Sequence, residues 1–339
     1  MSALPHVLHL VDDATPGGVT RVLAHIQSCP LMAKAGRHSV RVISRTGQLP
    51  KCDADMIVSH LSLNWRRMPA LIGFRARHAT TPLIHVEHSY TAMFTAINVR
   101  SKLRFFTMLR TAYALFDTVV AVSDAQAKWL TERRLVSSQS LRVIAPVVDL
   151  AGFRALPAPQ GTPKVIGAIG RLHRQKGFDV LIKAFRALPN PDLALHIHGT
   201  GPDEDALKAL AGDDPRIRFF GHAQRSEDVM ETVDIVAMPS RWEAFGLVAL
   251  EARAAGRPLI CAPSDGLSMS AGPNARYVKG LGATAWSAAL LDMVQQVSPL
   301  SETDRVSACE SEFAASWQDL IDRHTSPAGE TGTVLVQAA

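Results

Sequence analysis

The sequence predicts an α/β protein in which two domains each contain a parallel sheet. Short apolar runs typical of strands alternate with segments typical of helices along most of the chain, the pattern of parallel sheets with crossover helices. A break at residues 152–163, which holds three prolines and Gly161, separates two such alternating halves. The length of 339 residues also fits two domains of about 150 residues each better than a single core.

We therefore expect an N-terminal domain at residues 1–155 and a second domain at residues 163–308. A C-terminal helix is predicted at 309–325, followed by a flexible tail at 326–339 that nothing in its composition ties down. The hydrophobic content of 47% is sufficient for two substantial cores.

The first half begins with an expected strand at 6–11, a turn at Pro16-Gly17-Gly18 and a helix at 19–28. Ser123 carries an N-cap side chain directly before an expected helix at 125–135. The other short apolar runs predict strands at 40–44, 56–60, 83–86, 118–122 and 141–145.

The second half repeats the alternation. A strand at 165–169 ends at Gly170-Arg171, and a helix begins near Phe178 with apolar residues at helical spacing. Pro239 ends another apolar run, and a helix-forming segment follows Gly246 and stops at Gly256. The strands expected in this half lie at 165–169, 193–198, 217–220, 233–238 and 258–262.

Two glutamates separated by seven residues mark the turn after Pro239. Glu243 lies in the predicted strand-to-helix loop, whereas Glu251 lies inside the helix that follows. A helix N-terminus favours an anion, so carboxylates beside it suit the hydroxyls of a ribose and a sugar better than further charge. The alternative is an ordinary βα unit with a surface glutamate and a helix-face glutamate.

Two cationic residues occupy the loop after the strand at 165–169. Arg171 and Lys176 lie at the carboxyl end of that strand, where open α/β sheets bind ligands. A guanidinium can bind two phosphate oxygens, and a lysine adds a point charge. Solvated loop charges are the alternative for an isolated pair of this kind.

Both segments resemble the motifs of one family. The glutamate pair resembles the E-x7-E signature, and residues 170–177 resemble the G-R-L-x-x-x-K-G motif, of retaining glycosyltransferases of family four (glycosyl transferases group 1). The resemblance covers roughly residues 5–325 and is strongest at 164–262. It implies the GT-B fold, in which two Rossmann-like domains with parallel sheets face a central cleft.

The resemblance also implies a function, that of a hexosyltransferase-type enzyme of class EC 2.4. Such an enzyme moves a sugar, with retention of configuration, from a UDP-, GDP- or ADP-sugar to a lipid-linked, polysaccharide or other glycan acceptor. The alternative is a non-catalytic GT-B subunit that binds a sugar nucleotide or supports a partner enzyme. Intact motif residues argue against that alternative.

Individual roles follow from the resemblance. Glu251 would bind the nucleotide ribose, Glu243 would face the donor sugar, and the donor diphosphate would lie against Arg171 and Lys176. His88, which follows the strand at 83–86, matches a histidine that faces the donor sugar, so His88 and Glu243 are the catalytic candidates. The other donor-binding candidates are Gly17 and Gly18 of a glycine loop, and Phe245, Gly246 and Leu247 of the glutamate motif.

His88 has two rival interpretations: a zinc pair with His85, for which no third ligand is evident, or a structural histidine at a strand end. The chain also departs from the family pattern at two places. Residues 264–270 replace a Gly-Gly-x-x-Glu stretch, which leaves open which groups touch the donor there. Residues 146–149 replace an Asn-Gly-Val-Asp hinge.

No metal or other cofactor is expected, because the cationic side chains and the helix N-terminus near Gly246 can stabilise a diphosphate leaving group. Asp53 and Asp55 resemble the D-x-D metal motif of a different glycosyltransferase fold, but they precede a strand and are interpreted as structural. The four scattered cysteines predict a reduced, cytoplasmic protein, and neither a signal peptide nor a spanning helix is expected.

The sequence indicates less about the acceptor than about the donor. Residues 100–116 form a basic, aromatic-rich segment that fits peripheral binding to an anionic membrane surface on the inner face of the cell membrane. A packed helix with a solvated basic side is the alternative. The net charge of +5 is too small to require nucleic acid, and no nucleic-acid motif is present.

Overall fold

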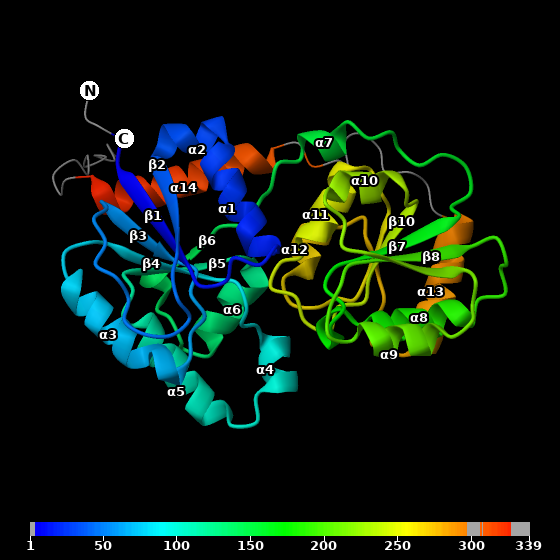
Figure 1. The fold of residues 1–339 in the computed structure, drawn as a ribbon, viewed down its shortest axis with the longest axis horizontal. Helices are drawn as coiled ribbons and strands as arrows, with labels where there is room; N and C mark the ends of the chain where they lie inside the picture. Colours follow the sequence, from blue (N-terminus) through cyan, green and yellow to red (C-terminus); the bar gives the residue numbers. More distant parts are fainter. Residues whose placement is uncertain (1–3, 297–305, 307, 327–339) are drawn as a thin grey trace, which may run out of the picture.

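The computed structural model describes residues 4–296, 306 and 308–326 and contains two six-stranded sheets (Figure 1). The first sheet has the strand order β2-β1-β3-β4-β5-β6, and the second has the order β12-β11-β10-β7-β8-β9. Every strand pair is parallel. The predicted α/β class with two parallel sheets is therefore confirmed.

The first sheet is built from the N-terminal half of the chain. Its strands are β1 (His6–Val11), β2 (Arg37–Val42), β3 (Met56–Ser59), β4 (Leu83–Glu87), β5 (Thr118–Ala121) and β6 (Leu141–Val143). The helices of this half are α1 (Gly18–Ser28), α2 (Pro30–Ala35), α3 (Met68–Arg77), α4 (Ala92–Asn98), α5 (Lys102–Tyr113) and α6 (Asp124–Glu132). Two 3-10 turns lie at Trp65–Arg67 and Ser138–Ser140.

The second sheet is built from the C-terminal half. Its strands are β7 (Val165–Ile169), β8 (Ala194–His198), β9 (Ile217–Gly221), β10 (Ile235–Met238), β11 (Leu259–Cys261) and β12 (Arg276–Tyr277). The helices are α7 (Ala151–Arg154), α8 (Phe178–Arg186), α9 (Glu204–Ala211), α10 (Ser226–Glu231), α11 (Leu247–Ala254), α12 (Leu267–Ala271), α13 (Ala283–Gln296) and α14 (Cys309–Thr325), with a 3-10 turn at Arg174–Lys176.

Most expected strands agree with these bounds to within a few residues, and Ser123 accepts a hydrogen bond from Gln126 N at 3.3 Å as the predicted cap of α6. The expected break at 152–163 is wrong at its start, because α7 occupies residues 151–154. Its Phe153 is fully buried, so this turn of helix belongs to the core. The short strand β12 was not predicted.

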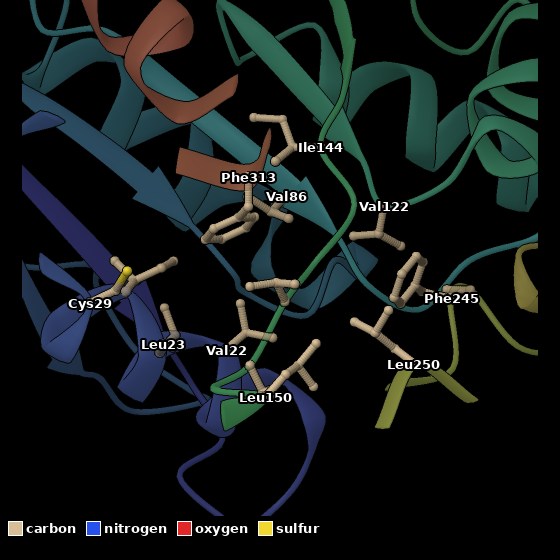
Figure 2. Packing of buried hydrophobic residues seen from close by; sticks show 14 of the residues in the cluster. Val22, Leu23, Cys29, Val86, Val122, Ile144, Leu150, Phe245, Leu250 and Phe313 are labelled. Atoms are coloured by element: carbon tan, nitrogen blue, oxygen red, sulfur yellow. The ribbon is translucent and has the colours of Figure 1, made fainter. Parts of the chain in front are cut away.

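The first hydrophobic cluster joins the two halves. Figure 2 shows Val22 and Val122 of the first half in the same cluster as Phe245 and Leu250 of the second. α14 also returns to the first half and packs beside α2, with Trp317 buried in this cluster (Figure 1). At the end of α14, His324 Nε2 lies 2.9 Å from Thr118 Oγ1 at the start of β5. These contacts hold the two sheets in one arrangement.

Several remaining expectations concern single residues. The four cysteines are free, as expected. Asp55 accepts a hydrogen bond from His6 N at 2.7 Å and so has the structural role predicted for it. Among the described residues, no helix is long and apolar enough to cross a membrane. The predicted tail at 326–339 lies outside the described residues except for Ser326.

Candidate active site

Lys176 and Glu243 meet between two loops of the second sheet. Lys176 follows β7 and Glu243 follows β10, and Lys176 Nζ lies 2.6 Å from Glu243 Oε2. The two side chains are only 17% and 13% exposed, so their attraction is less screened than that of a surface pair. Lys176 and Glu243 are 67 positions apart in the sequence, and they form an ion pair in the structure.

Gly177 allows the two loops to approach this closely. It has φ +69°, and a Cβ at this position would lie 2.1 Å from the Pro239 carbonyl oxygen. Neither the left-handed backbone nor the contact tolerates a side chain. Gly177 thereby sets the distance between the loop of Lys176 and the loop of Glu243.

Arg241 connects the same two loops through hydrogen bonds. Its guanidinium binds both carboxylate oxygens of Asp179, at 2.8 and 2.7 Å, and donates to the Arg174 carbonyl at 2.6 Å. Burial alone would raise the pKa of Asp179, but the hydrogen bonds from Arg241 lower it below its ordinary value. The pair is therefore ionised at neutral pH and holds the loop of Glu243 in place.

Glu251 lies inside α11, where its side chain is completely buried. Arg21 of α1 reaches it from the other half of the molecule, with Arg21 Nη1 2.6 Å from Glu251 Oε1. Burial raises the pKa of Glu251, and the Arg21 charge opposes that shift. The second oxygen, Oε2, has no hydrogen-bond partner among the described residues. A buried acceptor without a partner is energetically unsatisfied, so a hydroxyl that reached Oε2 would form a favourable hydrogen bond.

The N-termini of α1 and α11 meet beside this ion pair. A Cβ on Gly18 would lie 3.3 Å from Leu247 Cδ1, so the first residues of the two helices are in close contact. Gly17 precedes α1, and Gly246 precedes α11 with φ +93°. The N-terminus of a helix carries a positive dipole end that favours an anion, although Gly17 N already donates to Thr20 Oγ1 at 3.0 Å.

Arg171 is exposed in the loop of Lys176. It is close enough to Asp13, which follows β1, to contribute to lowering the pKa of that carboxyl, after the hydrogen bonds from Thr15 and the charge of Arg45. Arg171 thus faces the first half of the molecule, and the structure brings Gly17, Gly18, Arg171, Lys176, Glu243, Gly246, Leu247 and Glu251 to one junction between the two sheets.

Phe245 differs from the other candidates of its motif. Its side chain is buried in the hydrophobic cluster near Val122 and Leu250 (Figure 2). Ser270 Oγ donates to its carbonyl at 2.5 Å. The Phe245 side chain therefore anchors the loop of Glu243 in the core, where it also lines a cavity beside Leu250 and Val147.

The stretch at 264–270 supports this loop and reaches the first half. Gly266 N donates to the Glu243 carbonyl at 3.0 Å. Asp265 accepts from Thr91 Oγ1 at 2.6 Å and from Met93 N at 3.1 Å, at the start of α4. The residues that replace the family's Gly-Gly-x-x-Glu stretch thus bind α4 and the backbone of the Glu243 loop.

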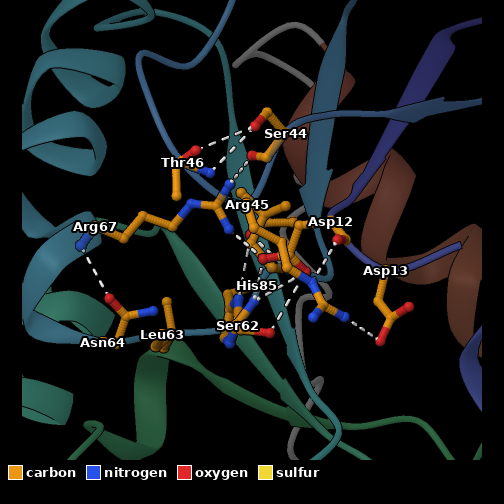
Figure 3. Close-up of polar contacts among 12 residues, drawn as sticks. Asp12, Asp13, Ser44, Arg45, Thr46, Ser62, Leu63, Asn64, Arg67 and His85 are labelled. Atoms are coloured by element: carbon orange, nitrogen blue, oxygen red, sulfur yellow. Dashed lines mark hydrogen bonds and ion pairs between the residues drawn. The ribbon is translucent and has the colours of Figure 1, made fainter.

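A second polar network lies where β1, β2 and β3 end (Figure 3). Arg67 forms a buried ion pair with Asp12 and donates to the Ser44 carbonyl at 2.6 Å. Asp12 also accepts from Ser62 N at 3.2 Å, and Arg45 pairs with Asp13. The network ties together the loops that follow three strands of the first sheet. It was missed because its members are far apart in the sequence and match no motif.

His88 follows β4 and is partly buried. Its Nε2 lies 2.8 Å from His60 Nδ1, so it is held by another histidine and does not pair with His85. Among the described residues, no group of three or more side chains has the arrangement of a metal site. His85 instead lies 3.6 Å from Glu87, which also accepts a hydrogen bond from Tyr113 at 2.7 Å.

Two family models match the chain, one on each side of the break. The model described as Glycosyltransferase Family 4 matches residues 5–151, and the model described as Glycosyl transferases group 1 matches residues 163–296. The chain belongs to this glycosyltransferase family. The match covers both halves, including the loops of Lys176 and Glu243.

Curated relatives of this family member include D-inositol 3-phosphate glycosyltransferases. The protein from Mycobacterium marinum is 28% identical over 294 residues, which are 79% of this chain and 62% of the relative. The protein from Corynebacterium jeikeium is 34% identical over 206 residues, 52% of this chain and 49% of the relative. The aligned part thus spans about half to three fifths of the length of these relatives.

Solved structures show that the family member has the GT-B fold. HepE of Anabaena, crystallised with UDP and glucose, superposes with a TM-score of 0.66 at 18% identity, covering 94% of this chain and 95% of HepE. WaaG, a glycosyltransferase involved in lipopolysaccharide biosynthesis, gives a TM-score of 0.66 at 16% identity, covering 95% of this chain and 100% of WaaG. The predicted fold of two Rossmann-like domains is confirmed.

Proposed function

We propose that the chain is a retaining glycosyltransferase that takes its sugar from a nucleotide-diphosphate sugar. One observation carries the proposal: Lys176, Glu243 and the Arg21–Glu251 pair surround the meeting point of two helix N-termini. Cationic side chains and helix N-termini suit a diphosphate, while the two carboxylates suit hydroxyl groups. The activities named for the relatives and for WaaG support this interpretation.

Each residue then has a defined task. Cleavage of the sugar–phosphate bond places negative charge on the diphosphate, which Arg171, Lys176 and the N-terminus of α11 stabilise. Glu243 accepts hydrogen bonds from the donor sugar and is held in position by Lys176. Glu251 accepts hydrogen bonds from the ribose through Oε2. We assign no nucleophile and no metal ion to the reaction.

The identity of the donor is an extension of the same proposal. HepE was crystallised with UDP-glucose as well as with UDP and glucose, which makes UDP-glucose the first donor to test. GDP- and ADP-sugars have the same diphosphate and ribose and are the alternatives. A lipid-linked, polysaccharide or other glycan acceptor fits the biosynthetic role named for WaaG.

The exposed end of α5 favours an acceptor at a membrane surface. α5 buries Met108, Leu109, Ala112 and Tyr113 in its second half, whereas Leu103 is 80% exposed beside Lys102 and Arg104. Met93 and Ile97 of neighbouring α4 are also exposed, at 40% and 36%. Basic and apolar side chains at one end of the molecule fit peripheral binding to the inner face of the cell membrane.

Vesicle co-sedimentation tests the membrane part. The protein should bind vesicles that contain anionic lipid, and Leu103→Ser combined with Lys102→Ser should reduce binding without changing the melting temperature. Lys128→Ser is the matched control, because the Lys128 side chain of α6 is also exposed. Equal binding of all three proteins, or none by the wild type, would count against this surface.

Turnover tests the enzymatic part. Incubation with UDP-glucose should release UDP slowly by hydrolysis even without an acceptor, and the rate should survive EDTA because cationic side chains stabilise the leaving group. Loss of turnover in EDTA that manganese restores would contradict the assignment of no metal. Nucleotide binding without release from any of the UDP-, GDP- or ADP-sugars would favour a non-catalytic subunit.

A further inference from the structure

Four histidines form a continuous hydrogen-bonded chain across the first sheet. His38 Nδ1 lies 3.1 Å from His9 Nε2, His9 Nδ1 lies 3.0 Å from His60 Nε2, and His60 Nδ1 lies 2.8 Å from His88 Nε2. The residues come from β2, β1, the end of β3 and the end of β4, which are in contact in that order. The chain therefore runs from an edge strand to the cleft candidate His88.

Both ring nitrogens of His9 and His60 are used by the chain. His9 and His60 are 0% and 8% exposed, and their rings stack with centroids 5.3 Å apart. Trp317 of α14 packs on His9 with an edge contact at 5.6 Å. The geometry leaves these two rings little freedom to turn or to take other partners.

The rings are neutral at physiological pH. Burial lowers the pKa of His9 to about 3 and the pKa of His38 and His88 to about 4, and it lowers the pKa of His60 as well. The titratable groups that face the chain are His6 beside His38, and His85 and Glu87 beside His60 and His88. Each ring in the chain therefore carries one proton.

Proton counting leaves only two arrangements. A neutral ring has one N–H and one bare nitrogen, and each of the three hydrogen bonds needs one of each. If His88 Nε2 donates to His60, then His60 donates to His9, His9 donates to His38, and His38 carries its proton on Nε2. In the reverse arrangement every proton lies on Nδ1. The tautomer of His88 is therefore coupled to that of His38.

The surroundings of His38 favour the first arrangement. Its Nε2 is buried and has no hydrogen-bond partner among the described residues, and the Met32 backbone acts to raise the pKa of the ring against the larger effect of burial. A carbonyl can accept but cannot donate, and because His38 Nδ1 is already bonded to His9, the effect of Met32 favours a proton on Nε2. In this arrangement His88 carries its proton on Nε2, and His88 Nδ1 is unprotonated. No described residue is hydrogen-bonded to His88 Nδ1.

We infer that His38, His9 and His60 are positioning residues that fix His88 in its Nε2–H tautomer, so that Nδ1 is presented as a hydrogen-bond acceptor for a hydroxyl of the bound sugar. The tautomer part rests on the hydrogen-bonded chain and on the surroundings of His38, whereas the sugar contact rests on the proposed function. Because the hydrogen bond made by one ring nitrogen sets the state of the other, a change at His38 can alter the hydrogen-bonding character of His88 Nδ1.

Two-bond ¹H–¹⁵N spectra of the protein without donor measure the tautomers directly. All four rings should be neutral at pH 7 and protonated on Nε2. His60→Phe keeps a planar ring but removes both of its hydrogen bonds, so His88 should become a mixture of tautomers. His38→Phe should also make His88 a mixture of tautomers, although His38 does not contact His88. This variant takes the place of His60→Phe if His60→Phe does not fold.

His25→Phe is the matched control, because His25 is also a buried histidine of the first half and lies outside the chain. It should leave the His88 signals unchanged. A wild-type His88 protonated on Nδ1, or present as a mixture, would overturn the inference, as would a His88 tautomer that neither chain variant alters.

Activity measurements separate the tautomer of His88 from its contact with the sugar. If the function is as proposed, His38→Phe should lower the rate of sugar transfer several-fold while the affinity for nucleotide diphosphate stays the same. If no sugar nucleotide binds, the proposed function fails although the tautomer result can still hold. Unchanged transfer by a variant whose His88 tautomer has become mixed would overturn the sugar contact.

Discussion

Lys176→Ala should lower the rate of sugar transfer by about 10²–10³-fold, or 2.7–4 kcal/mol, if the site is closed to water during the reaction. The variant loses a cation proposed to bind the leaving diphosphate and also leaves the Glu243 carboxylate without its partner at 2.6 Å. Both changes place uncompensated negative charge where more negative charge develops. Steady-state kinetics at saturating donor would measure the loss.

Lys183→Ala is the control for this variant, because Lys183 is an exposed lysine on α8, close to Lys176 in sequence. It should behave as the wild type. Arg171→Ala should also reduce turnover, but less than Lys176→Ala, since Arg171 is exposed and its charge is screened by solvent. Wild-type kinetics in Lys176→Ala would refute the diphosphate assignment.

Glu251→Ala should weaken binding of the free nucleotide diphosphate by about 1.5–3 kcal/mol, the range for hydrogen bonds to a charged group. The carboxylate is fully buried, and Oε2 is the atom assigned to the ribose. Glu243→Ala should leave that affinity nearly unchanged and should lower the rate of transfer. A contact with the reacting sugar can strengthen in the transition state, whereas a ribose contact contributes uniform binding.

Calorimetry with nucleotide diphosphate alone distinguishes the two glutamates. Arg21→Ala belongs in the same series, because it removes the partner of Glu251 and retains the carboxylate. If the ion pair mattered only for closing the two halves, Arg21→Ala and Glu251→Ala would weaken the nucleotide equally. Equal losses in Glu243→Ala and Glu251→Ala would contradict the division of roles and would leave the fold untouched.

The local sequence pattern was sufficient to predict most of the strands and the loops that carry the site. Residues 165–169 and 235–238 are apolar runs that end at turn residues, so Lys176 and Glu243 could be placed after strands. That both loops would lie together was implied by the family resemblance, and the approach itself depends on Gly177 against Pro239. α7 was not predicted because Gly152 and the nearby prolines are typical of a loop, and Phe153 is its single buried residue.

Contacts between the two halves could not be predicted. Arg21 and Glu251 lie on α1 and α11, and nothing in the spacing of either helix indicates that they meet. The same holds for Asp265 at the start of α4. The histidine chain needs the strand order β2-β1-β3-β4, which aligns His38, His9, His60 and His88 although the four residues are far apart in the sequence. Topology, and not local pattern, creates these sites.

A thermal-shift series tests most directly whether the junction between the two sheets binds a nucleotide-diphosphate sugar. A ligand that binds only the folded state at 100 times its Kd should stabilise it by about 2.7 kcal/mol. At least one of UDP-, GDP- and ADP-glucose should therefore raise the Tm of the wild type, and should do so less in Glu251→Ala. No shift with any of the three, or a full shift in Glu251→Ala, would contradict the account.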